Sequence, residues 1–483
     1  MSGQKSGLAV CGRLAGVVGL TIAVAIGVTG PVSALASTQA GGGQAGGGAA
    51  VAGPASALTG WRAYLGGAQH DSYSAGQTAI TPANATALTL KWQAGPGTDY
   101  LASPIVADNA VFIGASSGWF YKLSLTTGKV LHKFYLGVRK PTTCTGELGT
   151  VDTATVTTDP ADQRPTVYVA GADGYLYALR ASNLTVKWKS VIAIPSRTVN
   201  NYFDWSSPTV AHGKIYIGVA SNCDHPLVRA RLIAYHQRTG KRLAVFYTVP
   251  KGSIGGSVWS SVAVAADGDV FATTGNGPET QQLLGDSESI LKLSPSLQLL
   301  GKFQIPARQL KYDADFGSSP ALFGKYVGAC DKNGIFYVLR QSTMKVAWEN
   351  RISGPPTKIS GCIAAAVYNG HDLFLAGFAR TIKGVLYPGS VQERDPSTGK
   401  LIWQAGLPSG VIGSPSLDGG GVLVAGTYGS APASNATYLI DAANGTILAT
   451  LAAGNDFAQS AFADGMLVTA NSDGVFAYAP AAG

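Results

Sequence analysis

Short apolar stretches separated by glycine-containing turns run along most of the chain. Each unit begins with small residues, continues through two short apolar strands joined by a turn, and ends with an aromatic-rich strand and a Thr-Gly or Asn-Gly turn. The segment SPIVADNAVFIGASSGWFYKLSLTTGKVLHKF, which begins at Ser103, contains all of these features. Asp-Gly and Asn-Gly supply the positive φ that tight hairpins require. The pattern therefore predicts antiparallel sheets of four short strands.

This unit recurs along the chain at a spacing of about 50 residues, which is typical of β-propeller blades. Further copies begin near Asp152, Ser206, Ser260, Ser318, Cys362, Gly413 and Gln459, which makes eight in all. The last copy ends after three strands, and Leu88–Gln93 (LTLKWQ) best supplies its missing outer strand. Pairing of the two terminal segments leaves no open junction. We therefore predict an all-β fold, an eight-bladed β-propeller whose ring is closed by an N-terminal strand.

Tryptophans follow the same repeat. Trp188, Trp348 and Trp403 occupy the strand that comes after a blade-end turn, as in STGKLIW. A position that recurs in several blades favours docking between adjacent blades over stacking on a ligand.

The N-terminal residues have the pattern of a targeting segment. Lys5 and Arg13 form a basic region, residues 14–28 are apolar or small, and a small-x-small cleavage pattern ends at Ala36. This predicts a secretory signal peptide over residues 1–36. A transmembrane anchor is the alternative, but the apolar run of about 15 residues is shorter than the roughly 20 that a span needs. We therefore expect a secreted or cell-envelope location.

Composition sets the remaining domain limits. Residues 37–58 are rich in Gly and Ala and are typical of a flexible linker, which leaves residues 59–483 for the propeller. Only 13% of the residues are charged, and the net charge of +8 includes two residues of the predicted signal peptide. Basic residues occur singly or in short clusters without interleaved aromatics, so no nucleic-acid partner is expected.

Four cysteines follow the predicted signal peptide: Cys144, Cys223, Cys330 and Cys362. An even number in an exported chain predicts two disulfides. Three pairings are possible, and the positions of the cysteines in neighbouring blades favour Cys144–Cys223 and Cys330–Cys362. A zinc site is the rival interpretation, but no CxxC spacing supports it. No CxxCH is present, so no covalently attached c-type haem is expected.

The blade segments YALRASNLTVKW, IAYHQRTGK and ERDPSTGKLIW resemble the quinoprotein repeat YxLDxxTGxxxW. The resemblance extends from about Trp61 to the end of the chain and implies the propeller type of the quinoprotein alcohol dehydrogenases, which use pyrroloquinoline quinone (PQQ). The same propeller also serves outer-membrane assembly scaffolds and sensor domains, so the resemblance is more specific for fold than for function.

Three segments carry the resemblance to the dehydrogenase site. GGSVWSSVAV…VFATTGNG implies that Trp259 forms the floor under PQQ and that Asn276 is a metal ligand. LKYDADFGSSPAL resembles the WDYD element, which implies that Asp313 is the catalytic base and a metal ligand and that Asp315 is a further ligand. CDKNGIFYVLR implies that Lys332 contacts the quinone oxygens. Such a site would take PQQ together with Ca²⁺ or a lanthanide, because carboxylate and amide oxygens suit these hard cations.

The chain also departs from the family pattern. The glutamate ligand of the family falls at or near His225, a poor Ca²⁺ ligand, so the adjacent Asp224 becomes the candidate. The disulfide between neighbouring cysteines that caps PQQ is missing, with only Cys144 in that region. The arginine that follows this disulfide is not evident, and Tyr312 replaces the tryptophan of WDYD.

Two functions remain open on the sequence. The first is a dehydrogenase that oxidises an alcohol, polyol or sugar and passes electrons to a separate acceptor. The second is a non-catalytic propeller that acts as an envelope scaffold or ligand-binding module. A hydrolase is disfavoured, because no GxSxG precedes a helix and no Ser-His-Asp set can be selected among the six histidines.

Overall fold

The computed structural model describes residues 60–97, 99–140, 146–160, 162–196, 201–224, 226–310, 313–354, 361–429 and 434–481. The predicted signal peptide and linker lie outside the described residues, as do Cys144, His225 and Tyr312. Helical structure in the described part is limited to the short 3-10 helices η1 (Tyr64–Gly66), η2 (Ala85–Ala87) and η3 (Ala307–Gln309). Within that part, no helix has the length and apolar character needed to cross a bilayer.

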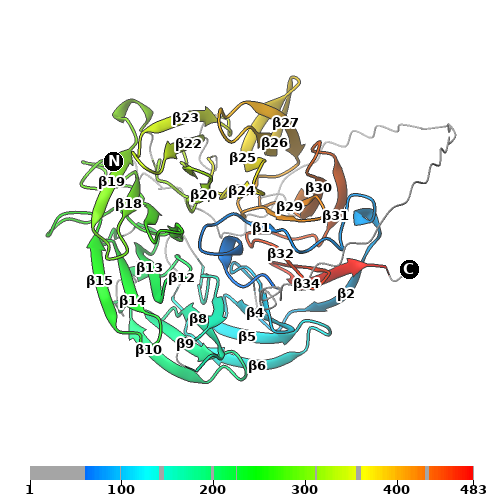
Figure 1. Cartoon of the computed structure of the whole chain (residues 1–483), viewed down its shortest axis with the longest axis horizontal. Coiled ribbons are helices and arrows are strands. Elements are labelled where there is room, and N and C mark those ends of the chain that lie inside the picture. Colours follow the sequence, from blue (N-terminus) through cyan, green and yellow to red (C-terminus); the bar gives the residue numbers. More distant parts are fainter. Residues whose placement is uncertain are drawn as a thin grey trace, which may run out of the picture. The chain divides into compact units, whose positions relative to one another are not determined.

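The described strands form eight sheets around a central axis (Figure 1). We number these sheets as blades 1 to 8 in chain order. Blades 1 to 4 contain β3 (Ile105–Ala107), β4 (Ala110–Gly114), β5 (Trp119–Ser124), β6 (Val130–Tyr135); β7 (Thr155–Thr158), β8 (Pro165–Ala170), β9 (Tyr175–Arg180), β10 (Val186–Val191); β11 (Tyr202–Phe203), β12 (Thr209–Ala211), β13 (Lys214–Ser221), β14 (Arg231–His236), β15 (Arg242–Tyr247); and β16 (Ala263–Val264), β17 (Val270–Thr273), β18 (Ser289–Leu293), β19 (Leu299–Gln304).

The second half of the ring repeats the same arrangement. Blades 5 to 8 contain β20 (Ala321–Phe323), β21 (Tyr326–Cys330), β22 (Ile335–Arg340), β23 (Val346–Arg351); β24 (Val367–Tyr368), β25 (Leu373–Ile382), β26 (Val385–Arg394), β27 (Leu401–Leu407); β28 (Ser416–Asp418), β29 (Val422–Gly426), β30 (Thr437–Asp441), β31 (Ile447–Leu451) with β1 (Tyr73–Ser74); and β32 (Ala461–Ala463), β33 (Met466–Asn471), β34 (Gly474–Pro480) with β2 (Leu88–Ala94). The eight-bladed propeller predicted from the sequence is therefore confirmed.

The ring closes through its terminal segments. Strand β2 pairs antiparallel with β34, from Leu88 opposite Pro480 to Ala94 opposite Val475. This confirms that the segment before the first full copy supplies the outer strand of the last blade. The outer strands differ from the inner ones in burial: β4 is buried throughout, whereas β6 is mostly exposed. The apolar runs of the inner strands therefore pack between neighbouring blades.

The blade-end tryptophans dock adjacent blades, as predicted. Trp348 of blade 5 donates its indole Nε1–H to the carbonyl of Pro396 in blade 6 at 3.0 Å. Its ring also lies against Gly399 of the same turn, where an added Cβ would come within 2.6 Å of an indole carbon. The glycine of the turn is thus required by the tryptophan of the preceding blade. Equivalent Trp–Gly contacts are Trp92–Gly128, Trp188–Gly240 and Trp403–Gly445.

A chain of hydroxyl groups links the innermost strands around the axis. The backbone N–H of Ser103 donates to Thr153 Oγ1 at 3.0 Å, and the N–H of Thr153 donates to Ser207 Oγ at 2.9 Å. Three further bonds of the same kind are Ser207 N to Ser261 Oγ, Ser261 N to Ser319 Oγ, and Gln459 N to Ser103 Oγ. The small residues that start each repeat therefore connect one blade to the next by side-chain hydrogen bonds.

The segment around η1 lies near the centre of the ring, in blue in Figure 1. The Leu65 side chain is fully buried. The backbone N–H of Leu65 donates to Gln459 Oε1 at 2.9 Å. Tyr64 OH lies 3.4 Å from Ser414 Oγ. His70 contacts the carbonyl of Pro320 through Nδ1 at 2.9 Å, so Nδ1 carries the proton. The repeat pattern did not predict the position of this central segment, because its residues lie outside the repeat.

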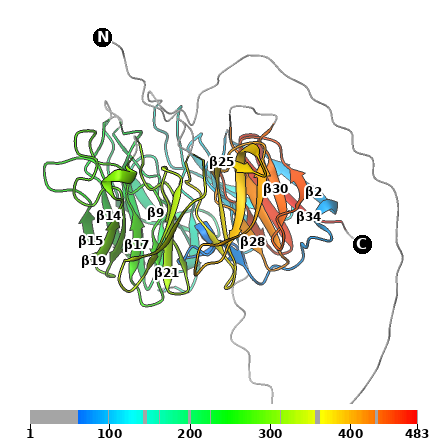
Figure 2. The same ribbon diagram turned by 90° about the horizontal axis from the view of Figure 1, so that it is seen from above.

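The two faces of the ring carry different connections (Figure 2). Because the four repeat strands of each blade are antiparallel, the turns between the second and third repeat strands share one face with the connections from one blade to the next. We call this the pocket face. The turns between first and second strands, and between third and fourth, lie on the opposite face.

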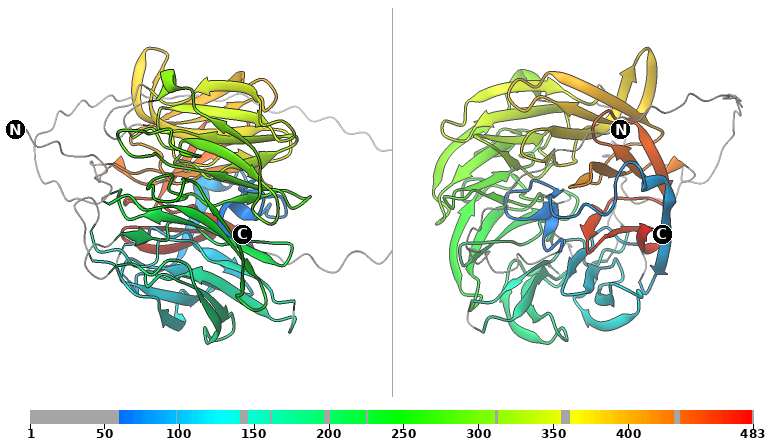
Figure 3. Two further views of the ribbon diagram at one scale, coloured as in Figure 1. Left: turned by 90° about the vertical axis from the view of Figure 1, so that its left-hand side faces the viewer. Right: turned by 45° about the vertical axis from the view of Figure 1, so that its right-hand side comes forward.

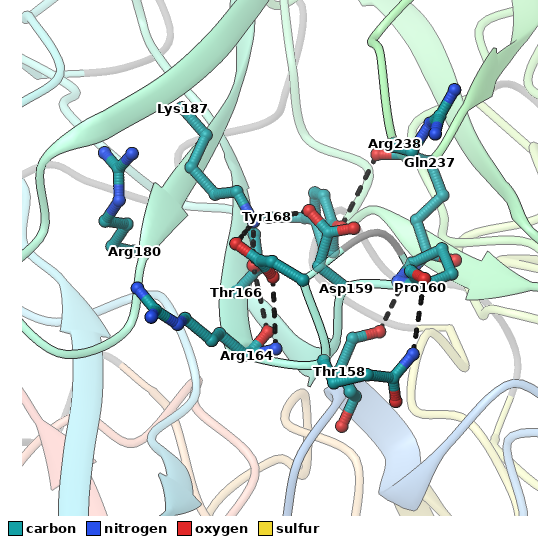
Figure 4. Close-up of polar contacts among 12 residues, drawn as sticks. Thr158, Asp159, Pro160, Arg164, Thr166, Tyr168, Arg180, Lys187, Gln237 and Arg238 are labelled. Carbon is teal, nitrogen blue, oxygen red and sulfur yellow. Dashed lines mark hydrogen bonds and ion pairs between the residues drawn. The ribbon is translucent and has the colours of Figure 1, made fainter.

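A polar cluster on the opposite face of blade 2 is structural (Figure 4). Lys187 on β10 forms ion pairs with Asp159 and, at 3.0 Å, with Asp162. Its ammonium also donates to Thr166 Oγ1 at 3.2 Å. Gln237 of blade 3 donates to the carbonyl of Thr158 at 3.3 Å, which ties this turn to the neighbouring blade. The cluster joins strands within blade 2 and joins blade 2 to blade 3.

Candidate functional site

One pocket opens around the axis above the chain of hydroxyl groups, with a water-accessible volume of about 240 Å³. Serine and threonine hydroxyls of the inner strands and Tyr64 lie at its base. One wall is apolar and includes Leu101, Leu148, Trp205 and Phe457. The opposite wall is acidic. The pocket therefore joins an apolar surface to a charged one.

The pocket brings together the residues that the quinoprotein resemblance selected. Trp259 lies in the connection from blade 3 to blade 4, and Asn276 lies in the turn that follows β17. Asp313 and Asp315 lie in the connection from blade 4 to blade 5, and Lys332 follows β21. All five line the pocket, because each leaves a strand on the pocket face next to the axis. The roles implied for them stay predictions.

Lys332 is the centre of the acidic wall. Its ammonium lies 2.7 Å from Asp315 Oδ1 and 3.0 Å from Asp313 Oδ1. It also lies 5.2 Å from the centre of the Trp259 ring, within reach of a cation–π interaction. Burial alone would lower the pKa of Lys332, but the two neighbouring carboxylates raise it above its usual value. Lys332 is therefore a permanent cation at this site.

The two aspartates differ in exposure. The Asp315 side chain is 5% exposed, whereas the Asp313 side chain is 24% exposed toward the pocket. Burial raises the pKa of Asp315 to about 7, although Lys332 opposes this shift. Asp313 adopts a positive φ of 57°, which turns the chain sharply between the two acids. Asp313 is thus the carboxylate that a molecule in the pocket can reach.

Three carboxylates converge on one point. Single oxygens of Asp224, Asp313 and Asp315 all lie within 4.8 Å of one another, a spacing that one cation could bridge. Asp224 is fixed by Ser221, whose hydroxyl donates to Asp224 Oδ1 at 2.7 Å. The structure therefore places Asp224, the candidate ligand from the sequence, beside Asp313 and Asp315.

Asn276 fits the same donor set. Its Oδ1 is buried against the pocket and has no hydrogen-bond partner within the described structure. A buried amide oxygen without a partner is costly unless a ligand satisfies it. Three carboxylates and one amide oxygen form the all-oxygen set that Ca²⁺ and lanthanides prefer. By the chemistry of its donors, the site therefore fits such a cation.

Two acids of the site were not predicted. Glu288 and Asp331 are fully buried beside this wall, and neither oxygen of Glu288 has a hydrogen-bond partner in the described structure. Burial raises the pKa of Glu288 well above its usual value, and the nearby Asp331 and Asp315 raise it further. Both acids flank strands, at positions where the sequence pattern gave no sign of burial.

The cysteines reinforce the same side of the ring. A disulfide joins Cys330 to Cys362, 32 positions apart, with a Cα–Cα distance of 5.4 Å. This is the blade 5 to blade 6 pairing that the sequence favoured. Cys223 is also a disulfide cysteine and lines the pocket, while its predicted partner Cys144 lies outside the described residues.

Comparison with known proteins identifies the family. The family model described as outer membrane protein assembly factor BamB (PQQ_2) matches residues 35–278 and 308–483. The chain belongs to this family of PQQ-like propellers. The chain is also similar in sequence to lupanine 17-hydroxylase [cytochrome c] from a Pseudomonas species, with 31% identity over 192 residues. The match covers 38% of this chain and 26% of that enzyme, so the chain spans about a quarter of the relative's length.

Solved structures show the fold of this PQQ_2 protein in dehydrogenases and in an assembly factor. Quinohemoprotein alcohol dehydrogenase from Comamonas testosteroni matches with a TM-score of 0.68 at 18% identity, covering 88% of this chain and 82% of that one. A europium-containing methanol dehydrogenase matches at 0.66 and 15%, covering 87% and 89%. BamB from Moraxella catarrhalis matches at 0.54 and 14%, covering 81% and 99%. At these identities the likeness establishes the fold alone.

Proposed function

We propose that this PQQ_2 propeller is a metal- and PQQ-dependent dehydrogenase that oxidises a small alcohol, polyol or sugar. The observation that carries the proposal is the convergence of Trp259, Lys332 and three carboxylates on one pocket. The likeness to alcohol and methanol dehydrogenases supports the same assignment.

The residues divide into two roles. Asp224, Asp313, Asp315 and Asn276 would hold a Ca²⁺ or lanthanide ion. The indole face of Trp259 and the ammonium of Lys332 would hold PQQ. When bound, PQQ supplies an electrophilic quinone that accepts a hydride from the substrate carbon.

Asp313 is placed to act as the general base. It is the more exposed of the two aspartates beside Lys332, so the hydroxyl group of an alcohol can reach it from the pocket. The ammonium of Lys332 donates to Asp313 Oδ1 at 3.0 Å and so restricts the orientation of this carboxylate. Asp313 would accept the hydroxyl proton while the apolar wall excludes water from the rest of the pocket.

The charge of the pocket lining also bears on how PQQ could bind. Its described lining contains one ammonium, that of Lys332, and four carboxylates, those of Asp224, Glu279, Asp313 and Asp315. PQQ is itself a polyanion, so it would be repelled from this pocket without an added cation. We therefore expect PQQ binding to require the metal, and a trivalent ion to support it better than Ca²⁺.

Reconstitution tests the proposal. PQQ is added to the purified protein with Ca²⁺, with La³⁺ or with EDTA, and dye reduction is followed with a panel of alcohols, polyols and aldoses. We expect activity only with a metal, and a loss of at least about a hundredfold in Asp313→Asn because a general base contributes this much. Asp286→Asn, which removes a carboxylate that pairs with Lys302 outside the pocket, is the matched control and keeps activity.

The second candidate is a non-catalytic envelope scaffold or ligand-binding module. The ion pair between Lys332 and Asp313 favours it, because such a pair can also serve only to join two blade connections. The family description as an assembly factor is consistent with it. Absence of PQQ uptake with either metal, measured by the absorbance of the cofactor after gel filtration, would establish this alternative and overturn the dehydrogenase.

The location and the electron acceptor follow from the same proposal. A protein exported through the predicted signal peptide would work outside the cytoplasm, in the envelope or beyond it. Electrons would pass to a separate acceptor such as a cytochrome or a dye. The name of lupanine 17-hydroxylase [cytochrome c] supports an acceptor of this kind.

A further inference from the structure

Exposed large hydrophobic side chains are distributed unevenly over the described surface. Most lie on the outer strand of a blade, such as Leu299 and Leu300 on β19. Four lie elsewhere in the described part of the chain. They are Ile194, Ile254, Val385 and Leu386, exposed to 51%, 44%, 54% and 67%.

All four belong to the pocket face. Ile194 lies in the connection from blade 2 to blade 3, and Ile254 lies in the connection from blade 3 to blade 4. Val385 and Leu386 lie at the end of the hairpin between β25 and β26, the second and third strands of blade 6. Among the described residues, the turns of the opposite face contribute no side chain to this exposed apolar set. The exposed aliphatic groups of the loops are thus confined to one side of the ring.

The β25–β26 hairpin is longer than its counterparts. Each strand has 10 residues, and the pairing continues to Ile382 opposite Val385. Lys383 and Gly384 form the turn with positive φ values of 50° and 83°. Figure 3 shows the hairpin, in yellow and gold, extending beyond the neighbouring sheets. The added length carries Val385 and Leu386, the most exposed adjacent pair of this set, away from the body of the blade.

Two of these apolar sites have a basic neighbour among the described residues. Lys251 and Lys383 lie within three positions of Ile254 and Val385 in the sequence. No Asp or Glu occurs within four positions of any of the four aliphatic residues. Aliphatic side chains flanked by cations and free of acids are typical of segments that enter the interface of an anionic bilayer.

We propose that the pocket face binds an anionic lipid surface through Ile194, Ile254 and the tip of the β25–β26 hairpin. The aliphatic groups would enter the headgroup region, and the neighbouring cations would pair with lipid phosphates. A protein partner fits this tip less well, because a stable interface buries about 800 Å² on each side. A turn that presents two adjacent aliphatic residues is far smaller, whereas insertion into lipid requires only a few side chains. The proposal is independent of the dehydrogenase activity.

Vesicle sedimentation tests the proposal. The chain from residue 37 to 483, without the predicted signal peptide, is spun with phosphatidylcholine vesicles or with a 3:1 mixture of phosphatidylcholine and phosphatidylglycerol. We expect binding to the anionic vesicles that weakens with salt. The double variant Val385→Ser/Leu386→Ser should bind at least about tenfold more weakly, because each buried aliphatic side chain contributes at least that much. Lys383→Ser should weaken binding about fivefold, from the usual contribution of one lysine near an anionic surface.

The matched control is Leu299→Ser/Leu300→Ser, which removes two adjacent exposed leucines, 42% and 54% exposed, from outer strand β19. It should bind anionic vesicles as the parent chain does. Absence of sedimentation with either vesicle would overturn the proposal. So would equal losses in the two double variants, or full vesicle binding by the hairpin variant, which would assign the tip to another partner. Circular dichroism of each variant checks that the propeller is intact.

Discussion

Lys332→Met provides the most direct test of the electrostatics of the pocket. Lys332 is 12% exposed and pairs with the 5% exposed Asp315 at 2.7 Å. Removal of one partner from a buried pair typically costs about 3–5 kcal/mol, because it leaves a buried charge without compensation. We therefore expect the variant to lose about 3–5 kcal/mol of unfolding free energy at pH 8 in EDTA. Methionine keeps most of the volume of the lysine stem, so packing contributes little to this loss.

The pH dependence of this loss has a definite sign. Burial raises the folded-state pKa of Asp315 to about 7, above its unfolded value of 3.8. A carboxyl group with a raised folded-state pKa contributes stability that is full below pH 3.8 and is lost as pH rises through about 7. Without Lys332 the folded-state pKa of Asp315 rises further. The destabilisation by Lys332→Met should therefore be larger at pH 8 than at pH 5.

Urea denaturation followed by tryptophan fluorescence measures both effects, with Lys302→Met as the control. Lys302 pairs with Asp286 at 2.8 Å but is 35% exposed, so its loss should cost less than about 1 kcal/mol. La³⁺ should raise the stability of Lys332→Met more than that of the parent chain, because the cation then has no ammonium to displace. Equal costs for the two lysine variants, or no difference between pH 5 and pH 8, would refute the view of Lys332 as the counter-ion of this wall.

Two further predictions concern the fold. Gly399→Ala places a Cβ within 2.6 Å of Trp348 at a φ of 73°, whereas Gly324→Ala, at a similarly unusual φ of 54°, has open surroundings. In urea denaturation, Gly399→Ala should therefore lose about 2 kcal/mol more unfolding free energy than Gly324→Ala. Equal losses would contradict the docking role of the turn. Burial lowers the pKa of His70 from 6.5 to about 4. The contribution of neutral His70 to the unfolding free energy is therefore complete above pH 6.5 and should fall by about 3 kcal/mol as the pH decreases to 4. His70→Gln should lack this decrease.

The sequence predicted the parts of the fold that repeat. The Trp–Gly contacts between blades follow from a position that recurs in several copies. The closing strand at Leu88 follows from the outer strand that the last copy lacks. The convergence of Trp259, Asp313 and Lys332 was also predictable, since each follows or precedes a strand at the same end of its blade. Equivalent ends of the inner strands lie around the same axis. Residues at equivalent positions of the repeat therefore lie close together.

Features outside the repeat were not predictable in the same way. The segment from Tyr64 to His70 fills the axis through contacts with residues more than 200 positions away, such as Pro320 and Gln459, and no periodic pattern marks them. Glu288 and Asp331 lie at strand ends where an acid is normally solvated. Their burial depends on how the neighbouring connections pack over them. Long-range contacts made by single residues thus set the limit of what the repeat could reveal.

The closed axis has a consequence for the proposed catalysis. Because Tyr64 and the chain of hydroxyl groups fill the base of the pocket, substrate and electron acceptor must approach from the pocket face. If the same face also lies against a lipid surface, the natural acceptor must reach the pocket along that surface, and acceptors held at the membrane would react faster than soluble ones.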